Sequence, residues 1–109
     1  MQSFSKNKIV LVKYPFTDHA DSKVRPAVVV NQSHFDDVFI VPLTSRTAYV
    51  GKDEFVLHDW SKSGLNVETA VKRGIYTINS NLILKEVGYL SIRDLEKLKS
   101  SILTWLNLK

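Results

Sequence analysis

A chain of 109 residues, 44% of them hydrophobic and 24% charged, is expected to form a single globular domain over residues 1–109. Because the sequence holds no cysteine, disulfide frameworks, thiol nucleophiles and cysteine-based zinc sites are excluded. The formal net charge of +4 is compatible with a polyanionic partner but does not require one.

The N-terminal residues and the apolar runs bear on location. Residues 1–8 are polar and contain no apolar segment of the kind found in a signal peptide. The apolar runs elsewhere are too short to cross a membrane. We therefore expect a cytoplasmic protein that does not use a membrane.

The first half of the chain predicts three short strands separated by polar turns. Runs of β-branched and other apolar residues predict strands over residues 9–14, 27–30 and 38–43. Residues 16–23 are polar and rich in turn-forming side chains, which predicts a hairpin loop. Residues 31–37 are polar as well and predict a second turn.

The second half predicts three further strands. Residues 54–57 can form a short strand, and residues 82–90 form a longer apolar run. Residues 69–78 alternate imperfectly and contain Gly74, which predicts one strand with a bulge or bend at that glycine.

The C-terminal segment predicts an amphipathic helix that begins after Ser91. Serine is a preferred N-cap residue, and Asp94 follows at the third position, close to a capping box. Leu103 and Trp105 widen the apolar face, which is then either generously buried on the sheet or in contact with another subunit. The residues at helical spacing are Ile92, Leu95, Leu98, Ile102 and Leu106.

The order of these elements predicts the fold class. Short strands separated by turns, followed by a single amphipathic helix, are typical of a small twisted β-barrel with the helix packed against it. We therefore expect a mainly β protein, a small barrel with a C-terminal α-helix.

A cation directly before a proline marks the start of the second predicted strand. Pro26 has no N–H for a sheet ladder, so we expect it at the first position of the strand or at an edge. A residue before proline is kept out of the α region, so Arg25 is expected to be extended, with its guanidinium pointing away from the core. An ordinary surface arginine and a fixed cationic site both fit this motif.

The histidines, glycines and acids show no metal or cofactor motif. His19, His34 and His58 have no second histidine or carboxylate at metal-ligand spacing. The four glycines are scattered and form no phosphate-binding loop. The acids are not paired for acid–base chemistry. We therefore expect neither a metal nor a cofactor.

Cations and hydroxyls gather at the ends of the predicted strands. Arginine provides a planar fork suited to phosphate, and a short hydroxyl adds a further contact. Thr44 and Ser45 follow the predicted strand over residues 38–43, where backbone N–H groups are often free to hold a phosphate oxygen. The set comprises His19, Lys23, Arg25, Thr44, Ser45, Arg46, Lys72 and Arg73.

Three segments, in this order along the chain, carry a resemblance to a known family. They are Lys-Val-Arg-Pro-Ala at residues 23–27, Val-Pro-Leu-Thr-Ser at residues 41–45 and Val-Gly-Tyr-Leu-Ser at residues 87–91. Together they resemble the MazF/PemK family of toxin ribonucleases, over about residues 8–108. The resemblance implies an SH3-like barrel of the CcdB/PemK type that forms a homodimer. It also implies metal-independent cleavage of single-stranded RNA, which leaves 2′,3′-cyclic phosphate and 5′-hydroxyl ends.

The resemblance further implies roles for individual residues. Arg25 matches the family's catalytic arginine, which suits charge stabilisation better than proton transfer because the free guanidinium has a pKa above 12. Thr44 matches a phosphate-contacting hydroxyl. His19 stands where one branch of the family has a functional histidine, and it is either a proton carrier or a solvated loop residue. The expected RNA contacts are Ser45, Arg46, Lys23, Lys72 and Arg73.

The chain also departs from the family. In one branch, an arginine and an aspartate two residues apart take part in catalysis on the strand before the segment matched here by residues 76–78. Val71 and Arg73 align with those two positions, so the aspartate is missing; a one-residue slip of the alignment would bring Lys72 or Arg73 to the arginine position. The chain can therefore cut slowly, use His19 together with Arg25, or bind RNA without cutting it.

Three functions remain open from the sequence. The leading one is a sequence-selective endoribonuclease toxin of a type II toxin–antitoxin pair, whose partner is an antitoxin with an acidic tail. The second is a CcdB-like gyrase poison, which would depend on residues 105–109 and not on Arg25. The third is an inactive member that binds RNA or the antitoxin, because a shared fold does not fix a function.

Overall fold

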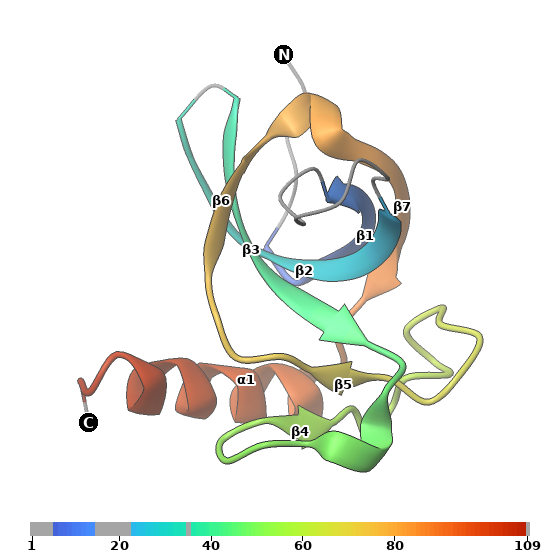
Figure 1. Cartoon of the computed structure of the whole chain (residues 1–109), viewed down its shortest axis with the longest axis vertical. Coiled ribbons are helices and arrows are strands. Elements are labelled where there is room, and N and C mark those ends of the chain that lie inside the picture. The colour runs from blue at the N-terminus through green and yellow to red at the C-terminus, as the bar shows by residue number, and fades with distance from the viewer. Residues whose placement is uncertain (1–5, 15–22, 35, 109) are drawn as a thin grey trace.

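The computed structural model describes residues 6–14, 23–34 and 36–108, and this part of the chain is mainly β (Figure 1). A single α-helix follows the last strand, and two short 3₁₀ turns lie between strands. The elements are β1 (Lys8–Tyr14), β2 (Lys23–His34), β3 (Asp37–Thr44), η1 (Thr47–Tyr49), β4 (Phe55–Val56), β5 (Ala70–Val71), β6 (Tyr76–Asn79), η2 (Ser80–Leu82), β7 (Ile83–Tyr89) and α1 (Ile92–Trp105).

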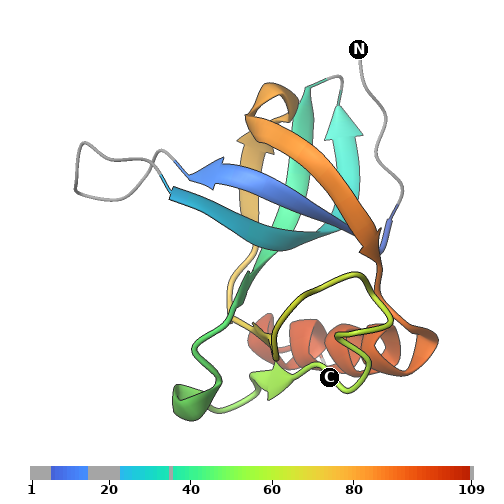
Figure 2. The ribbon, with the colours of Figure 1, turned by 90° about the vertical axis from the view of Figure 1, so that its right-hand side faces the viewer.

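The strands form one antiparallel sheet that curls on itself (Figures 1 and 2). Its order is β4-β5-β3-β2-β1-β7, and β6 pairs with the first half of β3. The pairs between described residues do not join β6 to β7, so the barrel is an open one. The expected fold class, a mainly β barrel-like sheet with a C-terminal helix, is confirmed.

Both faces of the central strands are apolar, because each face covers a different core. Successive side chains of a strand point to opposite faces, so neighbouring valines enter different clusters. One cluster fills the inside of the curled sheet, and the other lies between the sheet and α1. The first comprises Val10, Val12, Ala27, Val29, Val38, Ile40 and Ile78; the second comprises Ile9, Val28, Val41, Leu43, Phe55, Leu57, Val71, Leu90 and Leu98.

Helix α1 crosses one end of the sheet and is tied to the loops at both of its ends (Figure 2). As expected, the Ser91 hydroxyl caps the helix by accepting from the N–H of Asp94. The buried Asp94 carboxylate also accepts from the backbone N–H groups of His58 and Asp59, each at 2.9 Å. These two bonds connect a loop that is distant in sequence to the start of the helix. At the other end, the Trp105 indole N–H donates to the carbonyl of Asp53. In the described part of the chain, no helix is long and apolar enough to span a membrane.

Two strand boundaries differ from the sequence-based expectation. Residues 31–34 continue β2 and do not form a turn, and the pairing with β3 shifts register between Val29 and Asn31 and again between Gln32 and His34. These irregularities let polar residues stay in a paired strand. The segment 69–78 forms two strands, because the bend at Gly74, whose φ is +137°, sends β5 and β6 to different parts of β3.

The position of Pro26 is partly as expected. It is the fourth residue of β2, not the first, and it pairs with Leu11 of β1. The ladder between β2 and β3 begins one residue later, where Ala27 pairs with Pro42. Pro26 therefore stands at an edge on the β3 side, where its missing N–H removes no ladder bond.

Candidate nucleic-acid interface

Arg25 and Thr44 lie at the same end of two neighbouring strands. The β2–β3 ladder ends where Ala27 pairs with Pro42, so Arg25 lies two residues before this pair on β2 and Thr44 lies two residues after it on β3. Both residues are half-buried. By strand alternation Arg25 shares a face of β2 with Ala27, and the exposed Val24 lies on the other face; the direction of the Arg25 guanidinium stays a prediction.

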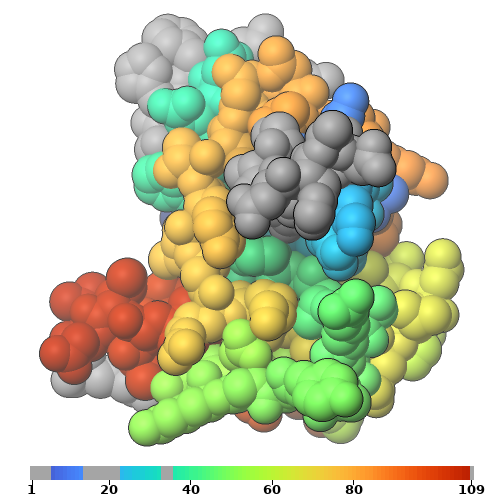
Figure 3. Space-filling view, in the orientation of Figure 1, coloured from blue at the N-terminus to red at the C-terminus, as the bar shows by residue number. Residues whose placement is uncertain are grey.

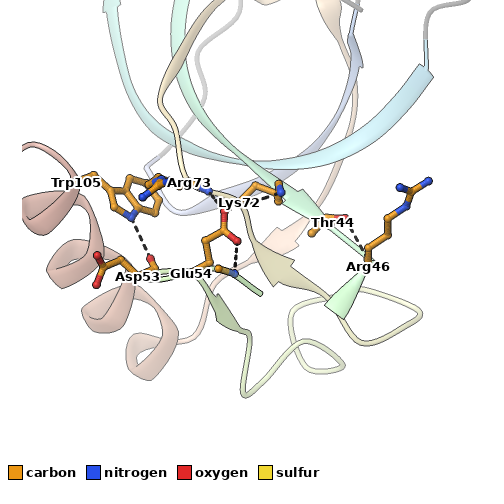
Figure 4. Close-up of polar contacts among 8 residues, drawn as sticks. Thr44, Arg46, Asp53, Glu54, Lys72, Arg73 and Trp105 are labelled. Carbon is orange, nitrogen blue, oxygen red and sulfur yellow. Dashed lines mark hydrogen bonds and ion pairs between the residues drawn. The ribbon is translucent and has the colours of Figure 1, made fainter. Parts of the chain in front are cut away.

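The turn after β3 presents a hydroxyl and an exposed cation on a fixed backbone. The N–H of Arg46 donates to the hydroxyl oxygen of Thr44 at 3.1 Å (Figure 4). The N–H of Thr47 donates to the carbonyl of Ser45, and the Thr47 hydroxyl donates to Glu68 at 2.8 Å. Because Thr44 uses its oxygen as an acceptor, its hydroxyl proton can still be donated to a phosphate oxygen.

Lys72 and Arg73 follow β5 and lie next to the end of β3. The N–H of Lys72 donates to the carbonyl of Pro42 at 2.9 Å, which holds this segment against β3. The Lys72 ammonium lies 4.0 Å from a carboxylate oxygen of Glu54, and the N–H of Arg73 donates to the same oxygen at 2.8 Å (Figure 4). Both cationic side chains are exposed.

The segments that carry these residues share one face of the molecule. Figure 3 shows the start of β2, the stretch that follows β3 and the residues after β5 on the side turned to the viewer. Lys23, the first residue of β2, is exposed. Seven of the predicted site residues lie in these segments or directly next to them, namely Lys23, Arg25, Thr44, Ser45, Arg46, Lys72 and Arg73. We call this face the cationic face.

His19, the eighth predicted site residue, lies outside the described residues, and its role stays a prediction. Within the described ranges, no group of three or more His, Asp or Glu residues is placed to hold a metal ion. The cationic face offers the guanidinium and ammonium groups of its arginines and lysines for phosphate, together with the hydroxyls of Thr44 and Ser45. Such groups can bind a phosphodiester and stabilise charge that develops on its oxygens.

Sequence reasoning missed Glu54, the carboxylate that touches the Lys72–Arg73 segment. Its partners Gly51 and Arg73 lie 3 residues before it and 19 residues after it. The only local signal is a glycine that precedes an acid by one turn, which is too common to single out a residue.

Comparison with known proteins identifies the family. The model of the PemK-like, MazF-like toxins of type II toxin–antitoxin systems matches residues 5–106, so the chain belongs to this family. The fold is similar to that of the Mycobacterium tuberculosis toxin MazF-mt6, with a TM-score of 0.74 and 21% identity over 94% of this chain and 98% of that one.

Two further solved structures have the same fold. An endoribonuclease from a mycobacterial species, solved in complex with its cognate antitoxin, has a TM-score of 0.74 and 15% identity over 98% of this chain and 96% of that one. An endoribonuclease from a mycobacterial species has a TM-score of 0.75 and 15% identity over 98% and 94%. A search among curated proteins found no match.

Proposed function

We propose that this toxin is a metal-independent endoribonuclease that cleaves single-stranded RNA with some sequence selectivity. The observation that supports the proposal is that Arg25 and Thr44 each lie two residues beyond the last β2–β3 pair, Ala27 with Pro42, at the same end of two neighbouring strands. An arginine fork and a hydroxyl on the same face suit one phosphodiester, and exposed cations on both sides suit the phosphates next to it.

The proposed reaction uses the RNA's own nucleophile. The 2′-oxygen attacks the neighbouring phosphorus, the bond from phosphorus to the 5′-oxygen breaks, and a 2′,3′-cyclic phosphate forms. The 2′-hydroxyl loses a proton and the leaving 5′-oxygen gains one, so atoms and charges balance. Arg25 stabilises charge on the phosphoryl oxygens, Thr44 donates a hydrogen bond to one of them, and His19 or solvent moves the protons.

The proposed partners follow from the same face and from the family. A solved structure with this fold is that of an endoribonuclease in complex with its cognate antitoxin. An antitoxin with an acidic tail would complement the exposed cations and cover the RNA site. We place the reaction in the cytoplasm, where messenger RNA is exposed.

The gyrase-poison alternative has less support than the ribonuclease. That function would depend on residues 105–109 being available to a partner. Trp105 instead donates its indole N–H to the carbonyl of Asp53 and packs against the core between sheet and helix. Trp105 is therefore not available to a partner, whereas Leu106 and Leu108 of the same segment are exposed.

Cleavage in excess EDTA tests the proposed function. Purified protein should cut single-stranded RNA at the same rate with and without EDTA, because the nucleophile is internal to the substrate. The control is a duplex of the same sequence, which should remain intact. Failure to cut any single-stranded RNA, or loss of cutting in EDTA, would contradict the proposal.

We also propose that the chain forms a homodimer. Besides the residues that pack on the core, α1 and the residues after it expose Leu103, Leu106 and Leu108. Burying such side chains against a second copy removes apolar surface from water. Light scattering at micromolar concentration should give twice the chain mass of 12.4 kDa, and a species of 12.4 kDa would contradict the dimer.

A further inference from the structure

One carboxylate joins two loops beside the cationic face. Glu54 directly precedes β4, and its side chain is only 10% exposed. One oxygen accepts from the N–H of Gly51 at 2.7 Å, and the other accepts from the N–H of Arg73 at 2.8 Å (Figure 4). The Lys72 ammonium lies 4.0 Å from the second oxygen. Glu54 thus connects the turn before β4 to the two cations that follow β5.

The position of this carboxylate is set by the protein core. The N–H of Glu54 donates to the carbonyl of Gly51, which closes the turn, and the indole N–H of Trp105 holds the carbonyl of Asp53 at 3.0 Å. Phe55, the next residue, is buried in the core between sheet and helix. The turn that carries Glu54 is therefore fixed by α1 and by the core, independently of any ligand.

The charge on Glu54 suits a holding role better than proton transfer. Burial alone would raise the pKa of Glu54, but the N–H groups of Arg73 and Gly51, together with the charges of Lys72 and Arg73, outweigh burial and lower it. The carboxylate is therefore ionised at neutral pH, and each of its oxygens already accepts a hydrogen bond.

We propose that Glu54 is a positioning residue for RNA binding, which fixes the backbone of residues 72–73 and so holds the cationic side chains of this segment in place for RNA. The second anchor of this segment is the bond from the Lys72 N–H to the carbonyl of Pro42. With both anchors in place, the backbone at Lys72 and Arg73 is ordered before RNA binds. Less conformational freedom is then lost on binding. This inference rests on the proposed function, since it takes RNA as the ligand of the cationic face.

The direction in which Glu54→Gln changes the affinity for RNA distinguishes positioning from simple charge repulsion. Glu54→Gln keeps the shape of the side chain, but its amide NH₂ faces one of the two N–H donors, so one bond is lost. Removing a negative charge near RNA would by itself tighten binding. Positioning predicts the opposite, namely a dissociation constant larger by about 3–10-fold, the effect of losing one modest hydrogen bond.

The probe is a fluorescent 2′-O-methyl RNA, which binds but cannot be cleaved by its own 2′-oxygen. Fluorescence anisotropy at several salt concentrations gives the affinity and its salt dependence. We expect the slope of log affinity against log salt to become shallower by roughly 0.7 for each phosphate contact that Glu54→Gln loses. A merely structural loss of stability would leave this slope unchanged, and thermal unfolding of each variant checks the fold.

Matched variants complete the test. Glu86→Gln removes a carboxylate that pairs with Lys8 at 2.7 Å on the β1–β7 side, and it should leave the affinity unchanged. In a chain that already carries Lys72→Ala and Arg73→Ala, Glu54→Gln should no longer weaken binding, because the side chains that it positions are gone. Glu54→Asp keeps the charge but shortens the reach by one methylene, and it should also weaken binding.

The outcomes distinguish this inference from the proposed function. Unchanged or tighter binding by Glu54→Gln would overturn the role of Glu54, while cleavage by the unmodified protein would still support the ribonuclease. Binding without cleavage of the matching unmodified RNA would overturn the proposed ribonuclease activity. The role of Glu54 would still be tested by the change in affinity for the 2′-O-methyl RNA. Absence of RNA binding would overturn both, and failure of both Glu54 variants to fold would make Glu54 a folding residue.

Discussion

Replacing Arg25 with alanine is expected to lower the rate of RNA cleavage by about 10²–10³, the usual cost of removing one preorganised charge stabiliser. Arg25 is half-buried near the start of β2, at the same strand end as Thr44, and in the proposed mechanism its guanidinium stabilises charge that develops on the phosphate. The loss should appear in kcat and in kcat/KM alike, because the contact strengthens in the transition state. Initial rates on a short single-stranded RNA in EDTA measure it.

Three further variants give this prediction its controls. Thr44→Ala should lose less activity than Arg25→Ala, because a neutral hydroxyl makes a weaker bond than a charged donor. Arg93→Ala removes an exposed arginine on α1, away from the cationic face, and should keep full activity. Arg25→Lys keeps the charge but not the fork, and an intermediate rate is expected. Full activity of Arg25→Ala would remove Arg25 from the mechanism.

Replacing Asp94 with alanine is expected to have the largest effect on stability, about 2–4 kcal/mol, because two backbone N–H groups lose a charged acceptor. The Asp94 carboxylate is buried and accepts from His58 and Asp59 at 2.9 Å each. It connects the start of α1 to the loop that follows β4, together with the ion pair of Arg93 with Asp59 at 3.5 Å. Urea unfolding followed by circular dichroism gives the free energy of unfolding of each variant.

Glu96→Ala is the matched control for Asp94→Ala. Glu96 lies one half-turn further along α1 and is exposed, so its loss should change the free energy of unfolding by no more than about 0.5 kcal/mol. Equal unfolding midpoints for the two alanine variants would show that the carboxylate of Asp94 does not hold the loop to the helix.

Local patterns predicted most of the fold. The apolar runs located β1, β3, β4 and β7, and the serine before an amphipathic segment located the start of α1. The polar residues 31–34 were misread as a turn, because register irregularities that keep polar residues in a strand leave no clear mark in one sequence. The sequence predicts a bend at Gly74 within one strand but not the division into β5 and β6, because it does not show which strands pair.

The candidate site likewise contains residues that local motifs single out and residues that depend on non-local contacts. Strand-end motifs singled out Arg25 and Thr44, which lie at the same end of β2 and β3, and their role in cleavage stays a prediction. Glu54 could not be found, because its bond to Arg73 joins residues 19 positions apart and depends on how two loops meet. Asp94 was assigned to a local cap, while its carboxylate instead reaches residues 35 and 36 positions earlier in the chain. Such non-local contacts are set by tertiary packing.

The chemistry of the product ends tests the central claim most directly. Single-stranded RNA should be incubated with the protein in excess EDTA, and the fragments analysed by mass spectrometry. If the 2′-oxygen is the nucleophile, the upstream fragment carries a 2′,3′-cyclic phosphate and the downstream fragment a 5′-hydroxyl. An RNA with a single 2′-deoxy nucleotide at the cut site should stay intact. A 5′-phosphate on the downstream fragment, or cleavage at the deoxy position, would contradict the proposed mechanism.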